Sequence, residues 1–347
     1  MLRIPLHRYI TCCHQKGSLT QSFRTASIKL IPKKGDCSKI KNWRPISLLS
    51  CLYKVVSRAL NNRLKTVSSI IFSRGQKGFT KDRHIQEVLI NLIEMIAHCK
   101  EYNIPGAILS IDTAKAFDSV SHKYMHYVYE FFGFGPNFIK LLETLGNNRT
   151  ACIAFDDGSH SAEIELGCGR AQGNTSSPVE YNMAQQIVIF KIELCPEVRS
   201  VYLNHFIARP YLDAPIPETP IIPLAADEAD QRFRNESAFE TSKADRFADD
   251  NTTGTIFEFN SLNAIKNILH DFSGISGLRC NTEKTALMQI GNKIPISEEI
   301  RSLGFDITDK VHILGMDIDS EISNLDENFG GTVTKLKNCI DYWKRYN

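Results

Sequence analysis

Two neighbouring carboxylates, Asp249 and Asp250, lie between apolar residues in the stretch RFADDNTTGTIF, residues 246 to 257. Like charges about 4 Å apart repel by about 1 kcal/mol in water and by about 4 kcal/mol at an effective dielectric near 20. A solvated turn, where Asp and Asn are favoured, tolerates this repulsion. In a buried setting the same pair requires a cation.

A third aspartate, Asp112, ends the apolar run GAILSID. If the two segments are neighbouring strands, their carboxylates converge at the edge of a buried sheet, and oxygen ligands of this kind suit Mg²⁺ or Mn²⁺. Two metal ions held by shared carboxylates serve in-line displacement at phosphorus, in polymerases and in nucleases, and the spacing does not choose between those classes. The strand period puts Asp249 on the face of Phe247 and Asp250 on the other face or in the turn, so their roles are unequal.

The elements that must position these carboxylates are visible as periodic patterns. Apolar residues recur three and four apart over residues 47–71 and 85–103, which predicts two helices that each pack on one face. Residues 106–112 predict a buried strand, and a helix is expected from about Ser119 to Phe132 with Asp118 as its cap.

The later part of the chain mixes strands and helices. Residues 151–166 predict a hairpin that turns near Asp156, and residues 177–194 predict a helix with Ser177 as N-cap and Pro178 at its first position. The Asp249–Asp250 stretch predicts a second hairpin, before a helix over 261–275 and strands near 285–290 and 311–316. Residues 196–245, with five prolines from Pro210 to Pro223, predict a long, poorly ordered insertion. Strands and helices without a regular βαβ period favour an α+β fold.

Charge is unevenly distributed along the 347 residues. Residues 1–65 carry fourteen Lys or Arg against one acid, whereas residues 197–250 hold eleven acids against six bases. A protein that grips a polyanion near bound cations has this pattern, although a solvated basic surface has it too.

Composition excludes several classes of protein. The ten cysteines include no CxxC pair, and the CCH at Cys12 to His14 lacks partner ligands, so structural thiols are expected rather than a zinc site or disulfide framework. No apolar run approaches the roughly 18 to 20 residues of a membrane span, and the first residues lack the apolar centre of a secretory signal. We therefore expect no membrane insertion or secretion, and a cytosolic or nuclear setting.

Seven motifs occur in one order along the chain. They are IKLIPKKGDCSKIKNWRPISLLSCLYKVVSRALNNRL, QKGFTKDRHIQEVL, SIDTAKAFDSVSH, GRAQGNTSSPVEYNMA, FADDNT, SGLRCNTEKTALMQIG and HILGMDID. Together they resemble the reverse transcriptase domain of non-LTR (LINE-type) retrotransposons, from about Ile28 to Asp319.

The resemblance implies a right-hand polymerase fold that adds deoxynucleotides (dNTPs) to a DNA primer on an RNA template, with two Mg²⁺ (or Mn²⁺) ions. It implies fingers over residues 28–105, a palm over 106–320 that contains the insertion at about 197–245, and the start of a thumb over 321–347. Residues 1–27 match the family poorly and form an uncertain N-terminal extension. No obligate protein partner is evident.

The resemblance also assigns the metal and sugar contacts. Asp112 and Asp249 become the paired metal ligands and catalytic carboxylates, with Asp250 as their support. Phe117 matches the aromatic residue that crowds the sugar 2′ position, although a core aromatic of the following helix would look the same. Asp118 matches the family's FD pair, but helix capping explains it equally well, and it is not assigned to catalysis.

Four further residues match substrate-binding positions of the family, and a fifth matches a possible general acid. Lys33 and Arg44 match basic residues that hold the incoming triphosphate, and general phosphate contact is the alternative for both. Gln172 and Gly173 match the QG pair beside the nucleotide. Lys284 matches a lysine that could protonate the leaving pyrophosphate, although exposed lysines are common.

Departures from the family limit the expected activity. The usual DPLSP reads NTSSP here, with Asn174 in place of the acid, and only 28 residues follow Asp319 where a thumb is expected. These features predict a fragment of a retrotransposon reading frame with reduced or no synthesis, and a catalytically dead nucleic-acid-binding remnant is the alternative. A polymerase that makes RNA is disfavoured by Phe117, because RNA synthesis needs room for the 2′ hydroxyl.

Overall fold

The computed structural model describes residues 3–33, 36–113, 116–201, 244–247, 250–280, 284–323 and 330. Its helices are α1 (Arg3–Lys16), α2 (Gln21–Arg24), α3 (Cys51–Ile71), α4 (Ile85–Glu101), α5 (Ala116–Ser119), α6 (His122–Phe131), α7 (Pro136–Gly146), α8 (Ser177–Leu194), α10 (Phe259–Ser276) and α11 (Glu298–Ser302), with a 3₁₀ turn at Ile40–Asn42. Its strands are β1 (Thr25–Pro32), β2 (Trp43–Leu48), β3 (Pro105–Ile111), β4 (Arg149–Ile153), β5 (Ile164–Leu166), β6 (Ala244–Phe247), β7 (Asp250–Ile256), β8 (Ala286–Gly291), β9 (Asp306–Ile307), β10 (Lys310–Ile313) and β11 (Met316–Asp319).

A five-stranded sheet with the order β6-β7-β3-β8-β9 forms the centre of the molecule. The apolar run of β3 puts alternate side chains on opposite faces. Leu109 and Ile111 join a large core with α3, α6, α8 and α10, whereas Ile108 joins a second core with α4 and the β10–β11 hairpin. Both faces of β3 are therefore covered, as its nearly all-apolar sequence predicts.

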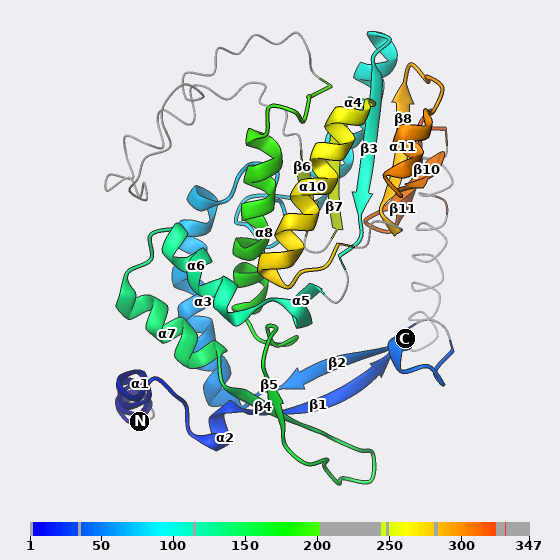
Figure 1. Ribbon diagram of the computed structural model, residues 1–347. Coiled ribbons are helices and arrows are strands. Elements are labelled where there is room, and N and C mark those ends of the chain that lie inside the picture. The colour runs from blue at the N-terminus through cyan, green and yellow to red at the C-terminus, as the bar shows by residue number, and fades with distance from the viewer. Residues whose placement is uncertain are drawn as a thin grey trace, which may run out of the picture.

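A second, four-stranded sheet has the order β2-β1-β4-β5. Strand β1 pairs antiparallel with β2 and parallel with β4, which comes more than 100 residues later in the chain. This sheet therefore joins strands from the range expected to form fingers with strands from the range expected to form palm. Figure 1 shows the C-terminal end of β3 pointing toward the β1–β2 hairpin.

The long predicted elements are confirmed. Helix α3 begins after Ser50, whose side chain accepts a hydrogen bond from the Tyr53 backbone amide at 3.2 Å, and α4, α10, β3 and the β4–β5 hairpin also lie where periodicity predicts them. Helix α8 is confirmed too, but its N-cap residue is Ser176, one residue before the expected Ser177.

The helix expected over residues 119–132 is confirmed as α6, but its start and its cap are wrong, because the helical backbone is interrupted between α5 and α6. Asp118 lies inside α5, and the cap of α6 is Ser121, whose side chain accepts from the Tyr124 amide at 3.3 Å. The break is satisfied by distant segments. The Val120 carbonyl accepts from Gly169 N at 2.8 Å, and the Ser121 amide donates to the Ser276 carbonyl at 2.8 Å.

The strand expected near 311–316 is instead a hairpin of β10 and β11. Leu314 and Gly315 connect the strands with φ values of 54° and 80°. Two successive positive φ angles are typical of a type I′ turn, which usually carries Asn or Gly at both positions. Because leucine is unusual at the first position, the sequence does not predict this turn.

The N-terminal extension folds against the rest of the molecule as far as it is described. Helix α1 contacts α7, and the ring centroids of Tyr9 and Phe23 lie 4.5 Å apart. Cys12 and Cys13 form no disulfide, and the described residues contain no group of three side chains arranged to hold a metal. The predicted insertion lies outside the described residues over 202–243, as does most of the segment after Ser323.

Among the described helices, none is both long and apolar enough to cross a membrane.

Candidate active site

The sheet register brings the two aspartate segments to one end of the central sheet. The β3–β7 ladder ends at the pair Ile111 and Asn251, so Asp112 and Asp250 are the next residue on each strand beyond that pair. Asp112 is exposed. Asp250 is described as the first residue of β7, but its side chain and the whole of Asp249 lie outside the described residues.

The backbone beyond Asp112 is tied to the same sheet end. Asn251 is buried and donates from Nδ2 to Thr113 Oγ1 at 3.2 Å, and Thr113 forms a bridge with Cys280. Strand β6 also reaches this end, because Phe247 pairs with Asp250. Phe247, Asp250 and the residue after β3 therefore share one edge of the sheet, and the convergence of the three carboxylates at this edge stays a prediction.

Lys284 lies close to this edge in register. It precedes by two residues Ala286, which pairs with Ser110 of β3, while Asp112 follows Ser110 by two residues. In an antiparallel ladder these offsets bring Lys284 and Asp112 to the same end of the two strands. The Lys284 side chain is exposed.

Phe117 has a clear packing role. Its ring stacks on Tyr181 of α8 with centroids 4.5 Å apart and an interplanar angle of 26°, and it packs against the large core while remaining partly exposed. Phe117 is thus partly a core aromatic residue, as the alternative reading expects. Its partly exposed ring lies on α5, five residues after Asp112 in the sequence.

Gln172 and Gly173 connect this region to the second sheet. The Gln172 carbonyl accepts from the Ser47 amide of β2 at 2.8 Å. Gly173 has a φ of 109°, and a Cβ there would lie 2.7 Å from the Ser47 carbonyl oxygen. Only glycine permits this φ and this approach at little cost. Glycine at this position thus permits a close approach to the backbone of β2, and its expected place beside the base pair stays a prediction.

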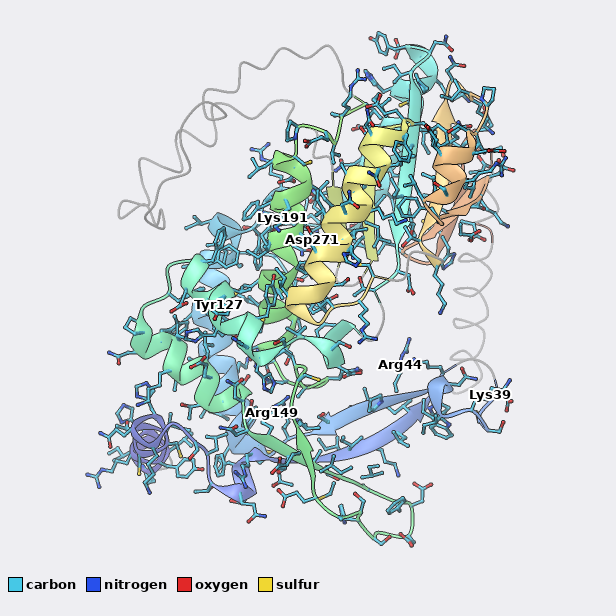
Figure 2. The ribbon with its side chains drawn as sticks, viewed as in Figure 1. Lys39, Arg44, Tyr127, Arg149, Lys191 and Asp271 are labelled. Carbon is cyan, nitrogen blue, oxygen red and sulfur yellow. The ribbon has the colours of Figure 1, made fainter. Side chains whose placement is uncertain are left out.

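The predicted triphosphate ligands lie on the β1–β2 hairpin. Arg44 is exposed on β2 and pairs in register with Ile31, two residues before Lys33 at the end of β1. Figure 2 shows Arg44 on the β1–β2 hairpin that faces the end of β3, with Lys39 near the tip of the hairpin. The hairpin thus presents cationic side chains on the side of the molecule where Asp112 lies.

Asn174, the departure from the family pattern, is a buried structural residue. Its side-chain oxygen accepts from Ser57 Oγ of α3, and its Nδ2 donates to Ser176 Oγ at 3.0 Å. A carboxylate at this position could only accept at both contacts, so the Ser176 hydroxyl would have to donate instead. The asparagine therefore suits the packing of the loop against α3.

A buried ion pair behind this loop is invisible to the motif analysis. Arg170 and Glu180 have side chains only 3% and 6% exposed, with Nε and Oε2 3.1 Å apart. Tyr129 donates to Glu180 Oε2 at 2.8 Å and accepts from Arg170 Nη2 at 3.1 Å. Burial raises the pKa of Tyr129, so this hydroxyl remains a neutral donor. Glu180, a charged residue inside the otherwise uncharged start of α8, is the sequence signal for this pair.

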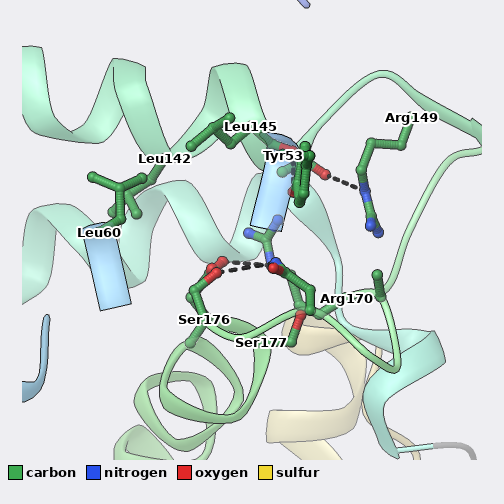
Figure 3. A pocket seen from close by; sticks show the side chains of 12 residues that line it. Tyr53, Leu60, Leu142, Leu145, Arg149, Arg170, Ser176 and Ser177 are labelled. Atoms are coloured by element: carbon green, nitrogen blue, oxygen red, sulfur yellow. Dashed lines mark hydrogen bonds and ion pairs between the residues drawn. The ribbon is translucent and has the colours of Figure 1, made fainter. Parts of the chain in front are cut away.

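Figure 3 shows the cavity beside this ion pair, lined from α3, α7, α8 and the loop before α8. It offers about 10 Å³ to the centre of a water molecule, which is room for about one water. Arg170 Nη1 and Ser177 Oγ are buried there and have no hydrogen-bond partner among the described residues. The cavity is too small for a nucleotide, so it is not a substrate pocket.

Comparison with protein families shows one match. Residues 31–209 match the model of the family described as "Reverse transcriptase (RNA-dependent DNA polymerase)".

Curated relatives match about half of this chain. A transposon TX1 protein of 149 kDa from Xenopus laevis is 35% identical over 178 residues, 51% of this chain and 14% of that protein. A Pol polyprotein of the type-1 retrotransposable element R2 from Popillia japonica is 26% identical over 53% of this chain and 26% of that protein. The RNA-directed DNA polymerase from mobile element jockey of Drosophila melanogaster is 28% identical over 48% of this chain and 18% of that protein. The chain thus spans about a quarter or less of the length of these relatives.

Solved structures show the same fold at low sequence identity. A truncated apo telomerase from Candida tropicalis aligns with a TM-score of 0.52 at 14% identity, over 90% of this chain and 57% of that one. The telomerase of Candida albicans in complex with a telomeric RNA fragment gives 0.50 at 10% identity, over 92% of this chain and 48% of that one. The expected right-hand polymerase fold is confirmed.

Proposed function

Because the family model covers more than half of its residues, the chain belongs to the reverse transcriptase (RNA-dependent DNA polymerase) family, and we propose that it is an RNA-directed DNA polymerase of a non-LTR retrotransposon. It would add dNTPs to the 3′ hydroxyl of a DNA primer on an RNA template. The observation that carries the proposal is the register that places Asp112 and Asp250 beyond the last β3–β7 pair.

The residues at this edge fit divalent metal ions. Asp112 is an exposed carboxylate on a rigid strand end, Asp250 begins the neighbouring strand, and Asp249 precedes it in sequence. Hard oxygen ligands are what Mg²⁺ and Mn²⁺ prefer, and the three aspartates would hold two such ions. When bound, the ions would supply charge neutralisation at the transferred phosphoryl group.

The chain's own residues would position the substrates. Lys33 and Arg44, on the hairpin opposite the end of β3, would hold the triphosphate of the incoming nucleotide. Phe117 would crowd the 2′ position, and its stacking on Tyr181 would keep the ring in place. Lys284 would donate a proton to the leaving pyrophosphate from the β8 side of Asp112.

Gln172 and Gly173 would lie beside the nascent base pair. Their loop is fixed at Ser47 on one side and by the Arg170–Glu180 ion pair on the other. We assign residues 28–105 to fingers, 106–320 to palm and the segment from 321 to the start of a thumb. The strands β4 and β5 would then support the fingers from within the palm range.

Primer extension tests this proposal. We expect the 347-residue chain to extend a DNA primer on an RNA template with dNTPs and Mg²⁺ or Mn²⁺ at a reduced rate, to incorporate ribonucleotides much more slowly still, and to lose extension in Asp249→Ala. Equal signals from the wild type and Asp249→Ala would refute the polymerase. Binding of the template-primer without any extension by the wild type would instead identify the chain as a nucleic-acid-binding remnant. Faster incorporation of ribonucleotides would indicate an RNA polymerase.

A further inference from the structure

The side chains of Asp118 and Gln172 form a pair that joins α5 to the loop before α8. Gln172 Nε2 lies 3.0 Å from both Oδ1 and Oδ2 of Asp118. An ionised carboxylate only accepts hydrogen bonds, so the amide group of Gln172 must face Asp118. The carboxamide oxygen of Gln172 and the second N–H of Nε2 are then left for other contacts, and the oxygen can only accept.

Backbone contacts fix the Asp118 side of this pair. Arg170 N donates to the Phe117 carbonyl at 2.7 Å, and Cys168 Sγ donates to the Asp118 carbonyl at 3.3 Å. Gly169 has a φ of 85°, and a Cβ there would lie 2.7 Å from the Asp118 carbonyl oxygen. The loop that carries Gln172 therefore lies directly against the backbone of α5.

The Gln172 side is fixed equally well. Its carbonyl is bound by the Ser47 amide of β2, Gly173 packs on the Ser47 carbonyl, and Arg170 is anchored in the core by Glu180. With the backbone held at three points, the main freedom left to Gln172 is rotation of its side chain. The Asp118 carboxylate removes that freedom by a charge-assisted hydrogen bond.

We propose that Asp118 is a positioning residue, which holds the Gln172 carboxamide so that its oxygen accepts a hydrogen bond from a donor group of the bound nucleotide. The inference rests on the proposed polymerase function and deepens it, because it gives the site a polarity. A hydroxyl or amino group of the nucleotide fits this acceptor, whereas a carbonyl or phosphate oxygen does not.

A polarity swap tests the role of the pair in the full chain. In Gln172→Glu two carboxylates oppose each other, and we expect the KM for dNTP to rise by about tenfold or more, with kcat changed less. In the double variant Asp118→Asn/Gln172→Glu, the introduced amide donates to the introduced carboxylate, and an acceptor oxygen remains at position 172. We expect the double variant to recover a KM within about threefold of the wild type.

Truncation variants complete the cycle. Asp118→Ala frees Gln172 and is expected to raise KM about as much as Gln172→Ala, and the double Ala variant should be no worse than Gln172→Ala alone. Thermal unfolding midpoints within about 2 °C of the wild type would show that the variants fold. Additive losses, or a polarity swap that is no better than Gln172→Glu, would overturn the positioning role.

Side-chain amide NMR separates this inference from the polymerase proposal. The Gln172 NH₂ signals should be protected from solvent exchange in the wild type and lose that protection in Asp118→Ala. Unchanged protection would refute the hydrogen bond itself. Protected signals in a wild type that extends no primer would refute the polymerase function, and the nucleotide role with it, while leaving the hydrogen bond in place.

Discussion

Several residues at the site are held by contacts that cannot be recognised from the sequence motifs. Gln172 and Gly173 can be identified from their motif, and Asp112 from the apolar strand before it. The sequence predicts Asp118 as a helix cap, yet its carboxylate binds Gln172, which lies 54 residues later in the chain. Asn174 suggests a weakened site, yet its side chain is buried between Ser57 and Ser176. A partner that is far away in the sequence leaves no local sequence pattern. The roles of Asp118 and Asn174 can therefore be assigned only from the folded structure.

His126 provides a pH-sensitive contact between α6 and α7. Its Nδ1 lies 2.7 Å from Glu143 Oε1, and this hydrogen bond raises the pKa of His126 in the folded state. The contact between protonated His126 and Glu143 therefore stabilises the folded state. This contribution is fully present below the pKa of an unfolded histidine, about 6.5, and is lost as the pH rises through the higher pKa of the folded state.

We predict that Glu143→Gln lowers the pKa of His126 in an NMR titration and flattens the loss of stability above about pH 6.5 in denaturant unfolding. The control is His270→Gln, since His270 is an 87% exposed side chain, and it should leave the pH dependence of stability unchanged. An identical His126 titration in the wild type and Glu143→Gln would contradict this assignment.

At the scale of elements, one buried ion pair couples the Gln172 loop to α8. Removing one partner of a buried pair leaves an uncompensated charge, which typically costs about 3 to 5 kcal/mol. Replacing both partners with apolar side chains of similar volume is often neutral, because neither charge then has to be desolvated. Arg170 and Glu180 are both nearly fully buried, so we expect both of these rules to apply to this pair.

We therefore predict that Glu180→Ala lowers the free energy of unfolding by about 3 to 5 kcal/mol, whereas Arg170→Met/Glu180→Leu recovers most of that loss. The matched control is Lys100→Ala, which removes a surface pair with Glu321 and should cost less than about 1 kcal/mol. Urea unfolding of the four proteins measures these differences. Equal losses of unfolding free energy in Glu180→Ala and Lys100→Ala would show that the Arg170–Glu180 pair contributes no more to stability than a surface pair.

Elements are also the scale at which sequence patterns are most informative. Helices α3, α4, α8 and α10 and strand β3 follow apolar periodicity, because each buries one or both of its faces. The break between α5 and α6 has no such signal, because it is stabilised by Gly169 and Ser276 from distant segments. The Leu314–Gly315 turn escapes prediction because leucine rarely adopts a positive φ.

At the scale of the whole molecule, the two sheets place a basic hairpin opposite an acidic edge. The parallel pairing of β1 with β4 is not predictable, since no pattern in either strand specifies a partner more than 100 residues away. The imbalance of fourteen bases against one acid in residues 1–65 fits a polyanion partner or a solvated basic surface, and only a binding measurement separates the two. Part of this charge lies exposed on α3, where Lys54 and Arg58 are one turn apart.

We predict that binding of an RNA–DNA primer duplex weakens steeply with salt, and that Lys54→Ala/Arg58→Ala makes the slope of log K against log salt shallower by about 0.9 for each phosphate that is no longer neutralised. Lys310→Ala, on β10 at the other side of the central sheet, should leave the slope unchanged. Filter binding over a range of salt concentrations measures both. Binding that is indifferent to salt would refute a nucleic-acid role for the basic segment.

The most direct measurement is single-turnover incorporation of one dNTP opposite an RNA template, because the proposed chemistry needs Asp112 at the end of β3 to act together with Asp250, the first residue of β7, and with Asp249, which precedes it in sequence. We predict that Asp112→Asn slows incorporation by at least about a hundredfold, since it weakens charge stabilisation at the reacting phosphate. The exposed Asp306→Asn on β9 should stay within about twofold of the wild type. Incorporation by Asp112→Asn at the wild-type rate would contradict the account.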